Sequence, residues 1–169
     1  MKHGIVIFNP HETGQIDRDA LLDSIKGSSF KTLCEQYGLD TSLIEPGLQH
    51  LDLILPSGEN TPFFQLKYQP SDRSPIMVYC WPAGSQPGRW LLKNGLDRAP
   101  NRQIKASLEV IKQVFVVEIK TSQLEDLGLL LAYELARWIA VKGNGILVGL
   151  DGKWYRLNRH QAFIPIESG

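Results

Sequence analysis

Cysteine is scarce in this sequence: the 169 residues include only two, Cys34 and Cys80. Two thiols cannot form the disulfide framework of a small secreted domain, and they do not give the paired spacing of a structural zinc site. Both lie among apolar residues, Cys34 at a helix-like position and Cys80 at a strand-like one. We therefore expect both side chains to lie in the core.

The sequence also lacks the common motifs of catalytic and metal sites. The 4 histidines form no HExxH motif and no ligand pair at helical spacing. There is no GxSxG nucleophile elbow, and the glycines at 143 and 145 are not part of a complete phosphate-binding loop. We expect no metal, no cofactor and no catalytic residues of these classes.

No apolar run is long enough to cross a membrane. The apolar run in the N-terminal stretch MKHGIVIFNP is also too short for a signal peptide. These absences predict a cytoplasmic protein that does not contact a membrane.

Net charge is absent too, because lysine plus arginine and aspartate plus glutamate both number 18. No global field therefore draws the protein to nucleic acid or to anionic lipid. The charges are nevertheless uneven: residues 1–60 contain 4 basic and 9 acidic residues, whereas residues 86–113 contain 6 basic and 2 acidic ones. This pattern predicts an acidic surface and a basic surface, although solvated helix and loop faces also explain it.

What the sequence does contain is the composition of a globular protein, with 43% hydrophobic and 21% charged residues. The length fits a single domain over residues 1–169. Alternating and apolar runs predict strands at 4–8, 51–55, 63–68, 76–81 and 114–120, and a terminal hairpin over 145–157 that turns at Asp151-Gly152. Helical spacing predicts helices at 17–26, 29–37, 102–113 and 122–143.

The last of these helices gives the clearest helical pattern. Ser122 and Glu125 have the spacing of a capping box, and Gly143 is a suitable C-terminal stop. The glycine- and proline-rich residues 83–101 read as a long loop. Most neighbouring strands are joined closely enough to be antiparallel. We therefore predict an α+β fold, with a largely antiparallel sheet and the Leu-rich helix and shorter helices packed on one face.

Two groups of residues suggest a metal-dependent nuclease. Nucleases of the PD-(D/E)xK type use an aspartate on one strand and a Glu/Gln-x-Lys motif on the next, where carboxylates hold Mg²⁺ and the lysine acts on the attacking water. Asp52 with Gln65 and Lys67 resembles this pattern, in an αβββαβ element order. Asp97 with Glu118 and Lys120 is a second setting, which fits less well because Asp97 lies in the expected loop.

Both settings have a simpler structural explanation. With a hairpin turn centred near Glu59, Asp52 lies nearly opposite Lys67, as in an ordinary cross-strand charge pair. In the stretch VFVVEIK, Glu118 and Lys120 share the polar side of a strand whose other side is apolar. The structural explanation is favoured for both settings.

Binding residues are the alternative to a catalytic site. Trp, Tyr and Arg dominate binding hot spots, and Trp81, Arg89 and Trp90 lie in or beside the expected loop. Both tryptophans would also serve as core anchors. Acidic residues of the first third, with Asp17, Asp19 and Asp23 as candidates, would steer association with a basic partner.

The Leu-rich stretch LEDLGLLLAYELARWIAVKGNG and the terminal hairpin ILVGLDGKWYRL resemble, in style, the immunity proteins of bacterial polymorphic-toxin and secretion-system effectors. The resemblance covers about the last third of the chain and has no diagnostic motif. It implies a non-enzymatic protein that binds and occludes one cognate toxin. A divergent PD-(D/E)xK-type nuclease and a generic regulatory interaction domain are the alternatives.

Overall fold

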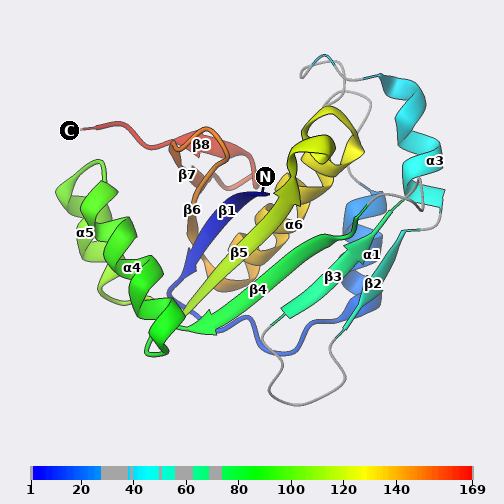
Figure 1. The fold of residues 1–169 in the computed structure, drawn as a ribbon. Coiled ribbons are helices and arrows are strands. Elements are labelled where there is room, and N and C mark those ends of the chain that lie inside the picture. The colour runs from blue at the N-terminus through cyan, green and yellow to red at the C-terminus, as the bar shows by residue number, and fades with distance from the viewer. Residues whose placement is uncertain are drawn as a thin grey trace. The chain divides into compact units, whose positions relative to one another are not determined.

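The structure is a computed structural model, and it describes residues 2–27, 38, 40–49, 51–55, 63–68 and 74–168 (Figure 1). The predicted helix at 29–37 and the predicted turn at 56–62 lie outside these residues, as does Cys34. The helices of the described part are α1 (Arg18–Lys26), α3 (Ile44–Gln49), α4 (Gln86–Arg98), α5 (Arg102–Leu108) and α6 (Leu127–Gly143), with 3-10 turns η1 (Thr41–Leu43) and η2 (Thr121–Glu125).

In the part of the chain that the structure describes, the strands form an 8-stranded sheet in the order β2-β3-β4-β5-β1-β6-β7-β8. Their bounds are β1 (Lys2–Asn9), β2 (Asp52–Ile54), β3 (Phe63–Lys67), β4 (Ile76–Pro82), β5 (Gln113–Lys120), β6 (Ile146–Val148), β7 (Trp154–Leu157) and β8 (Phe163–Pro165). The β2–β3, β3–β4, β1–β6, β6–β7 and β7–β8 pairs are antiparallel. The predicted α+β class with a largely antiparallel sheet is confirmed.

The chain divides into two compact units. The first consists of residues 1–4, 16–79 and 117–135, and the second of residues 5–15, 80–116 and 136–169. Strands β1, β4 and β5 and helix α6 each contribute residues to both units. The single-domain organisation stays a prediction, because compact units of this kind occur within one domain as well as between domains.

In the first unit, strands β2, β3 and β4 lie side by side (Figure 1). The register pairs Leu53 with Leu66 and Leu66 with Ile76, and all three side chains are buried. Residues on one face of a strand recur every second position, so the alternation in HLDLILP and PFFQLKYQP placed these leucines correctly. The predicted hairpin is confirmed in the described residues.

In the second unit, the β6–β7 hairpin turns as predicted at Asp151-Gly152. Gly152 has a φ of 76°, which a residue with a Cβ rarely adopts, and its N–H donates to the Gly149 carbonyl at 3.0 Å. The turn places Trp154 at the start of β7, where its ring stacks on Phe8 with 5.6 Å between centroids. Strand β8 follows, a strand that was not predicted from the sequence.

The largest correction concerns residues 83–101, which were predicted as a loop but contain helix α4 over Gln86–Arg98. The Ser85 hydroxyl accepts a hydrogen bond from the Gly88 N–H at 3.2 Å and caps the helix, and proline follows in its first turn. Glycine and proline lowered the helical signal, but here the glycines permit close packing. An ideal Cβ on Gly95 would lie 2.9 Å from the Phe8 ring.

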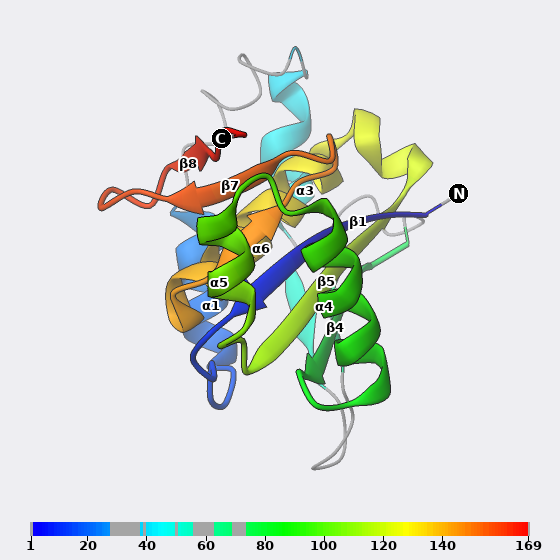
Figure 2. The same ribbon diagram turned by 90° about the vertical axis from the view of Figure 1, so that its left-hand side faces the viewer.

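Helices lie on both sides of β1 in the second unit, whereas the sequence predicted helices on one face only. Phe8 belongs to a cluster with Ile104 and Leu108 of α5, and Figure 2 shows α4 and α5 on the near side of β1. Asn9 points to the opposite side of the strand, where its Nδ2 donates to the Ile139 carbonyl of α6 at 3.0 Å. The sequence predicted a helix in the place of α5 but a loop in the place of α4, because glycine and proline weaken the helical pattern of residues 86–98.

The end of β1 is closely joined to the end of α6. Asn9 is fully buried, and a Cβ atom on Gly143 or Gly145 would overlap its side chain. The His11 N–H donates to the Gly143 carbonyl at 3.2 Å. The glycines at 143 and 145 therefore leave just enough room for a buried amide.

Helix α6 begins later than the capping pattern predicted. Residues Thr121–Glu125 form the 3-10 turn η2, and the helix begins at Leu127. The side-chain amide oxygen of Gln123 accepts from the Lys120 N–H at 2.8 Å, while the Asp126 carboxylate accepts from the Gly128 N–H at 2.7 Å. Two short-range caps replace the predicted pair of Ser122 and Glu125, and the predicted end at Gly143 is confirmed.

Candidate functional site

Trp90 on α4 is the most exposed large hydrophobic side chain in the described part of the chain, at 64%. It stands at a pocket of about 240 Å³ in the second unit. The pocket is lined by Val6, Phe8, Trp90, Leu91, Asn94, Gly95, Arg98, Val148, Gly152 and Trp154. An exposed indole beside a preformed hollow is an arrangement typical of binding surfaces.

The inner wall of the pocket is fixed by packing. Phe8 and Trp154 are 1% and 5% exposed and stack on each other. The Trp154 Nε1–H donates to the Arg98 carbonyl at 3.2 Å, which ties β7 to the end of α4. Close approach of Gly95 to Phe8 brings the helix onto the strand. The pocket is therefore held open by residues with little freedom to collapse into it.

Two polar side chains reach the pocket as well. Asn94 and Arg98 follow Trp90 by 4 and 8 positions in α4, so all three lie on one face of the helix. Neither the Asn94 amide nor the Arg98 guanidinium bonds to any of the residues that the structure describes. The pocket thus combines aromatic surface with hydrogen-bond donors and one positive charge.

The predicted residues Trp81, Arg89 and Trp90 do not form one group. Arg89 is exposed and next to Trp90 in α4, but its side chain does not line the pocket. Trp81 is half-buried in β4 and does not line it either. Asn94 and Arg98 were not predicted from the sequence, because their spacing from Trp90 places them on one face only if residues 86–98 form a helix.

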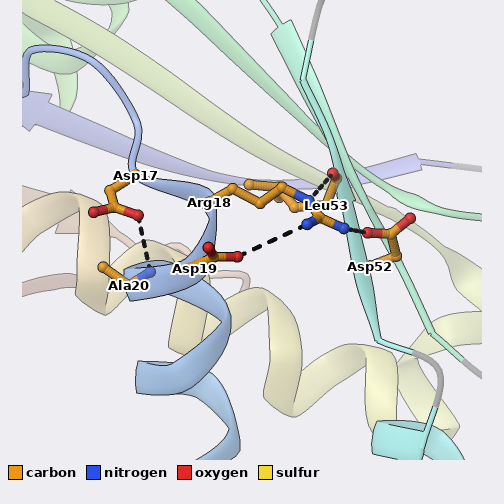
Figure 3. Close-up of polar contacts among 6 residues, drawn as sticks. All are labelled: Asp17, Arg18, Asp19, Ala20, Asp52 and Leu53. Carbon is orange, nitrogen blue, oxygen red and sulfur yellow. Dashed lines mark hydrogen bonds and ion pairs between the residues drawn. The ribbon is translucent and has the colours of Figure 1, made fainter.

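The predicted acidic residues lie on α1, in the first unit. Asp17 is the N-cap, and its carboxylate accepts from the Ala20 N–H at 3.1 Å (Figure 3). Asp19 is 3.8 Å from the Arg18 guanidinium. Asp23 is exposed, like the other two. The structure therefore brings the three aspartates together on one short helix, with Asp17 in a structural role.

Arg18 connects the same helix to strand β2. Figure 3 shows its side chain extending from the start of α1, where Nε donates to the Leu53 carbonyl at 3.1 Å and the guanidinium pairs with Asp52. Because both partners of this ion pair are about half exposed, at 47% and 48%, the pair contributes little free energy.

A double-mutant cycle measures that contribution. We expect Arg18→Ala and Asp52→Ala to couple by at most about 1 kcal/mol in the free energy of unfolding, because water screens an exposed pair. Urea denaturation at low and high salt measures the coupling, which should fall as salt rises. The matched cycle with Asp19→Ala should give a smaller coupling, and a larger value would contradict this ranking.

The arrangement of Asp52, Gln65 and Lys67 follows the cross-strand explanation. Asp52 and Lys67 are direct partners in the β2–β3 register, as the sequence predicted. The Asp52 carboxylate is engaged by Arg18, an arrangement that opposes cation binding. Among the residues that the structure describes, no group of three or more His, Cys, Asp or Glu side chains is placed to hold a metal ion.

The second nuclease setting is spread over different elements. Asp97 lies in helix α4, not in a loop, and belongs to the second unit, whereas Glu118 and Lys120 belong to the first. In β5 the residues Phe115, Val117 and Ile119 are buried, Glu118 is half-buried and Lys120 is exposed. The prediction of a strand with its charges on the more polar side is confirmed.

Cys80 is half-buried in β4, and burial raises the pKa of its thiol to about 11. With this pKa, only about one thiol in 1,000 is ionised at about pH 8. In a Cys34→Ser background we expect iodoacetamide to alkylate the native protein at least about 100-fold more slowly than the urea-unfolded chain. Mass spectrometry gives both rates, and similar rates would show an accessible thiolate instead.

In the part of the chain that the structure describes, none of the helices has the length and apolar character needed to span a membrane. Comparison with family models, with curated proteins and with solved structures gave no match to this chain.

Proposed function

We propose that this protein acts without catalysis, by binding one other protein, and that its partner is a bacterial toxin which it neutralises as an immunity protein in the cytoplasm. The class follows from the resemblance of its C-terminal third to such proteins. The proposal requires no cofactor, no nucleic acid and no membrane.

The observation that carries the proposal is the exposure of Trp90 above a preformed pocket. Leaving a tryptophan 64% exposed forgoes the free energy that burying it in the protein's own core would provide. Burial of Trp90 against a partner would recover this free energy. Aromatic residues at the centre of an interface carry much of its affinity because they bury a large area at a small entropic cost.

Three aspartates at the start of and within helix α1 add a second reason. Asp17, Asp19 and Asp23 are exposed there, against Arg18 and Lys26 as the basic residues of the helix, and no basic side chain other than Arg18 is paired with them in the described residues. Carboxylates in such a patch accelerate association with a basic protein and oppose binding to nucleic acid. A toxin that acts on nucleic acid presents a basic surface, to which these carboxylates are complementary in charge.

The test is capture of a partner with tagged protein from the native cells, washed at low and high salt and identified by mass spectrometry. We expect one stoichiometric partner whose toxicity is suppressed by co-expression of this protein. Trp90→Ala should weaken the complex by about 2 kcal/mol or more, which is about 30-fold in affinity.

The matched control is Val110→Ala, because Val110 is also apolar and highly exposed, at 61%, and does not line the pocket. This control should bind like the parent protein. A partner that binds both variants equally, or a partner without toxicity, would contradict the proposal.

A further inference from the structure

The helix that presents Trp90 is basic. Arg89, Lys93 and Arg98 are exposed on α4, against Asp97 as its single acidic residue. None of these three cations forms an ion pair with a residue that the structure describes. The surplus extends along residues 86–113, which contain 6 basic and 2 acidic residues. Positive charge without internal partners favours a partner of opposite sign.

The size of the pocket limits what it can receive. Pockets for small molecules typically have volumes of about 300–1,000 Å³ and enclose most of the ligand. This pocket is smaller, at about 240 Å³, and one of its walls is the largely exposed Trp90. A single apolar or aromatic side chain of another protein fits such a hollow better than an enclosed metabolite does.

We propose that the pocket binds an apolar or aromatic side chain of a partner segment whose neighbouring residues are acidic. The side chain inserts between Trp90 and the wall formed by Phe8 and Trp154. Arg98 pairs with a flanking carboxylate, and the Asn94 amide bonds to the partner backbone. This inference rests on the proposed function as a protein-binding protein and specifies the chemistry of the segment that is bound.

A protein segment fits these residues better than a nucleic acid strand. Proteins that bind single strands use several aromatic platforms along a basic groove, whereas Trp90 is the only largely exposed tryptophan among the described residues. The chain as a whole carries no net charge. The surplus of positive charge that could attract phosphate groups is therefore confined to α4 and α5.

A test that needs no cognate partner uses synthetic probes. The random copolymer of glutamate and tyrosine offers aromatic side chains flanked by carboxylates, polyglutamate offers the carboxylates alone, and the copolymer of lysine and tyrosine offers the aromatic with the opposite charge. Oligothymidylate represents nucleic acid. Titration is followed by the indole N–H resonances of the full chain, assigned by tryptophan substitution.

We expect the glutamate–tyrosine copolymer to shift the Trp90 resonance and to bind at least about tenfold more tightly than either other polypeptide. Binding should weaken as salt rises from about 0.05 to about 0.5 M. Equal binding of polyglutamate would show charge attraction without the pocket, and equal binding of the lysine copolymer would show a pocket without charge selection. Tighter binding of oligothymidylate at Trp90 would indicate a nucleic-acid surface. Each of these three results would overturn the inference.

Variants locate the binding. Trp90→Ala should abolish the shift of the Trp154 indole by the glutamate–tyrosine copolymer, and Arg98→Gln should weaken binding about tenfold. The controls are Val110→Ala and Arg159→Gln, which remove an exposed apolar group and an exposed charge outside the pocket. Circular dichroism confirms that each variant is folded.

The two proposals fail separately. A captured toxin that is lost with Trp90→Ala but keeps its affinity with Arg98→Gln would sustain the proposed function and overturn the acidic-segment inference. Copolymer binding that depends on Arg98, without any neutralised toxin, would sustain the binding chemistry and overturn the assignment as an immunity protein.

Discussion

Asn9→Asp should destabilise the protein by about 3 kcal/mol or more at about pH 7, the range expected for an uncompensated buried charge. Asn9 is fully buried and its Nδ2 donates to the Ile139 carbonyl at 3.0 Å. A carboxylate at this position would face that carbonyl with an oxygen atom in place of a donor. Gly143 and Gly145 lie so close to the side chain that a Cβ on either would overlap it, so it has little room to turn away.

The loss should depend on pH in a defined direction. Burial disfavours the charged form of the new carboxyl, so its pKa in the folded protein lies above its value in the unfolded chain. Stability relative to the parent is therefore highest below about pH 4, where both states are protonated, and decreases as pH rises toward the folded-state pKa. Urea denaturation at several pH values measures this difference.

A second variant separates burial from the chemical change itself. Asn158→Asp makes the same replacement where the side-chain oxygen accepts from the His160 and Ala162 N–H groups at 2.8 and 3.0 Å. Since a carboxylate accepts such bonds well, we expect little change in stability at about pH 7. A loss at Asn9 that is equally small, or independent of pH, would show that its amide is not enclosed as described.

Gly88→Ala should destabilise the protein by about 1–3 kcal/mol, the usual effect of overfilling a packed site. In an open helix the same change would stabilise by about 1 kcal/mol, because alanine is the better helix former. The sign is reversed here because a Cβ on Gly88 would overlap the carbonyl oxygen of Pro82, a backbone atom with little freedom to move. The first turn of α4 would have to shift away from the end of β4.

Gly84→Ala is the matched control, since an added Cβ there meets nothing within 4 Å. We expect it to leave the free energy of unfolding within about 1 kcal/mol of the parent value, with any change toward greater stability. Urea denaturation of both variants makes the comparison. A stabilised Gly88→Ala protein would mean that α4 does not begin against Pro82.

The elements predicted correctly from the sequence are those whose signal is local. The β2–β3 register followed from alternation around a turn, which placed Asp52 opposite Lys67, and Asp151-Gly152 fixed the β6–β7 hairpin. Strand β8 was missed because Phe163–Pro165 has only 3 residues and is recognised by its backbone pairing with β7. Such pairing leaves little trace in the pattern of side chains.

The site was only partly predictable, because it depends on contacts between distant residues. Trp90 was identified by its residue type. The pocket beside it could not be predicted, because Phe8 of β1 and Trp154 of β7 are far apart in the sequence and come together only in the folded protein. Helix α4 was hidden because Gly88 and Gly95 are poor helix formers in isolation, and their value lies in the tertiary packing that they permit. Local propensity carries no information about such packing.

The hydrogen bond from Arg18 to the Leu53 carbonyl has a consequence for self-association. Among the strands that the structure describes, β2 is at the edge of the sheet, and backbone groups at an edge invite pairing with a strand of another molecule. The Arg18 side chain covers one of these groups and places a charged guanidinium across the strand. An incoming strand would have to displace this guanidinium from both Leu53 and Asp52. The Arg18 side chain thus opposes edge-to-edge association of β2 with another molecule. This effect is separate from the small free energy that the Arg18–Asp52 pair contributes to folding.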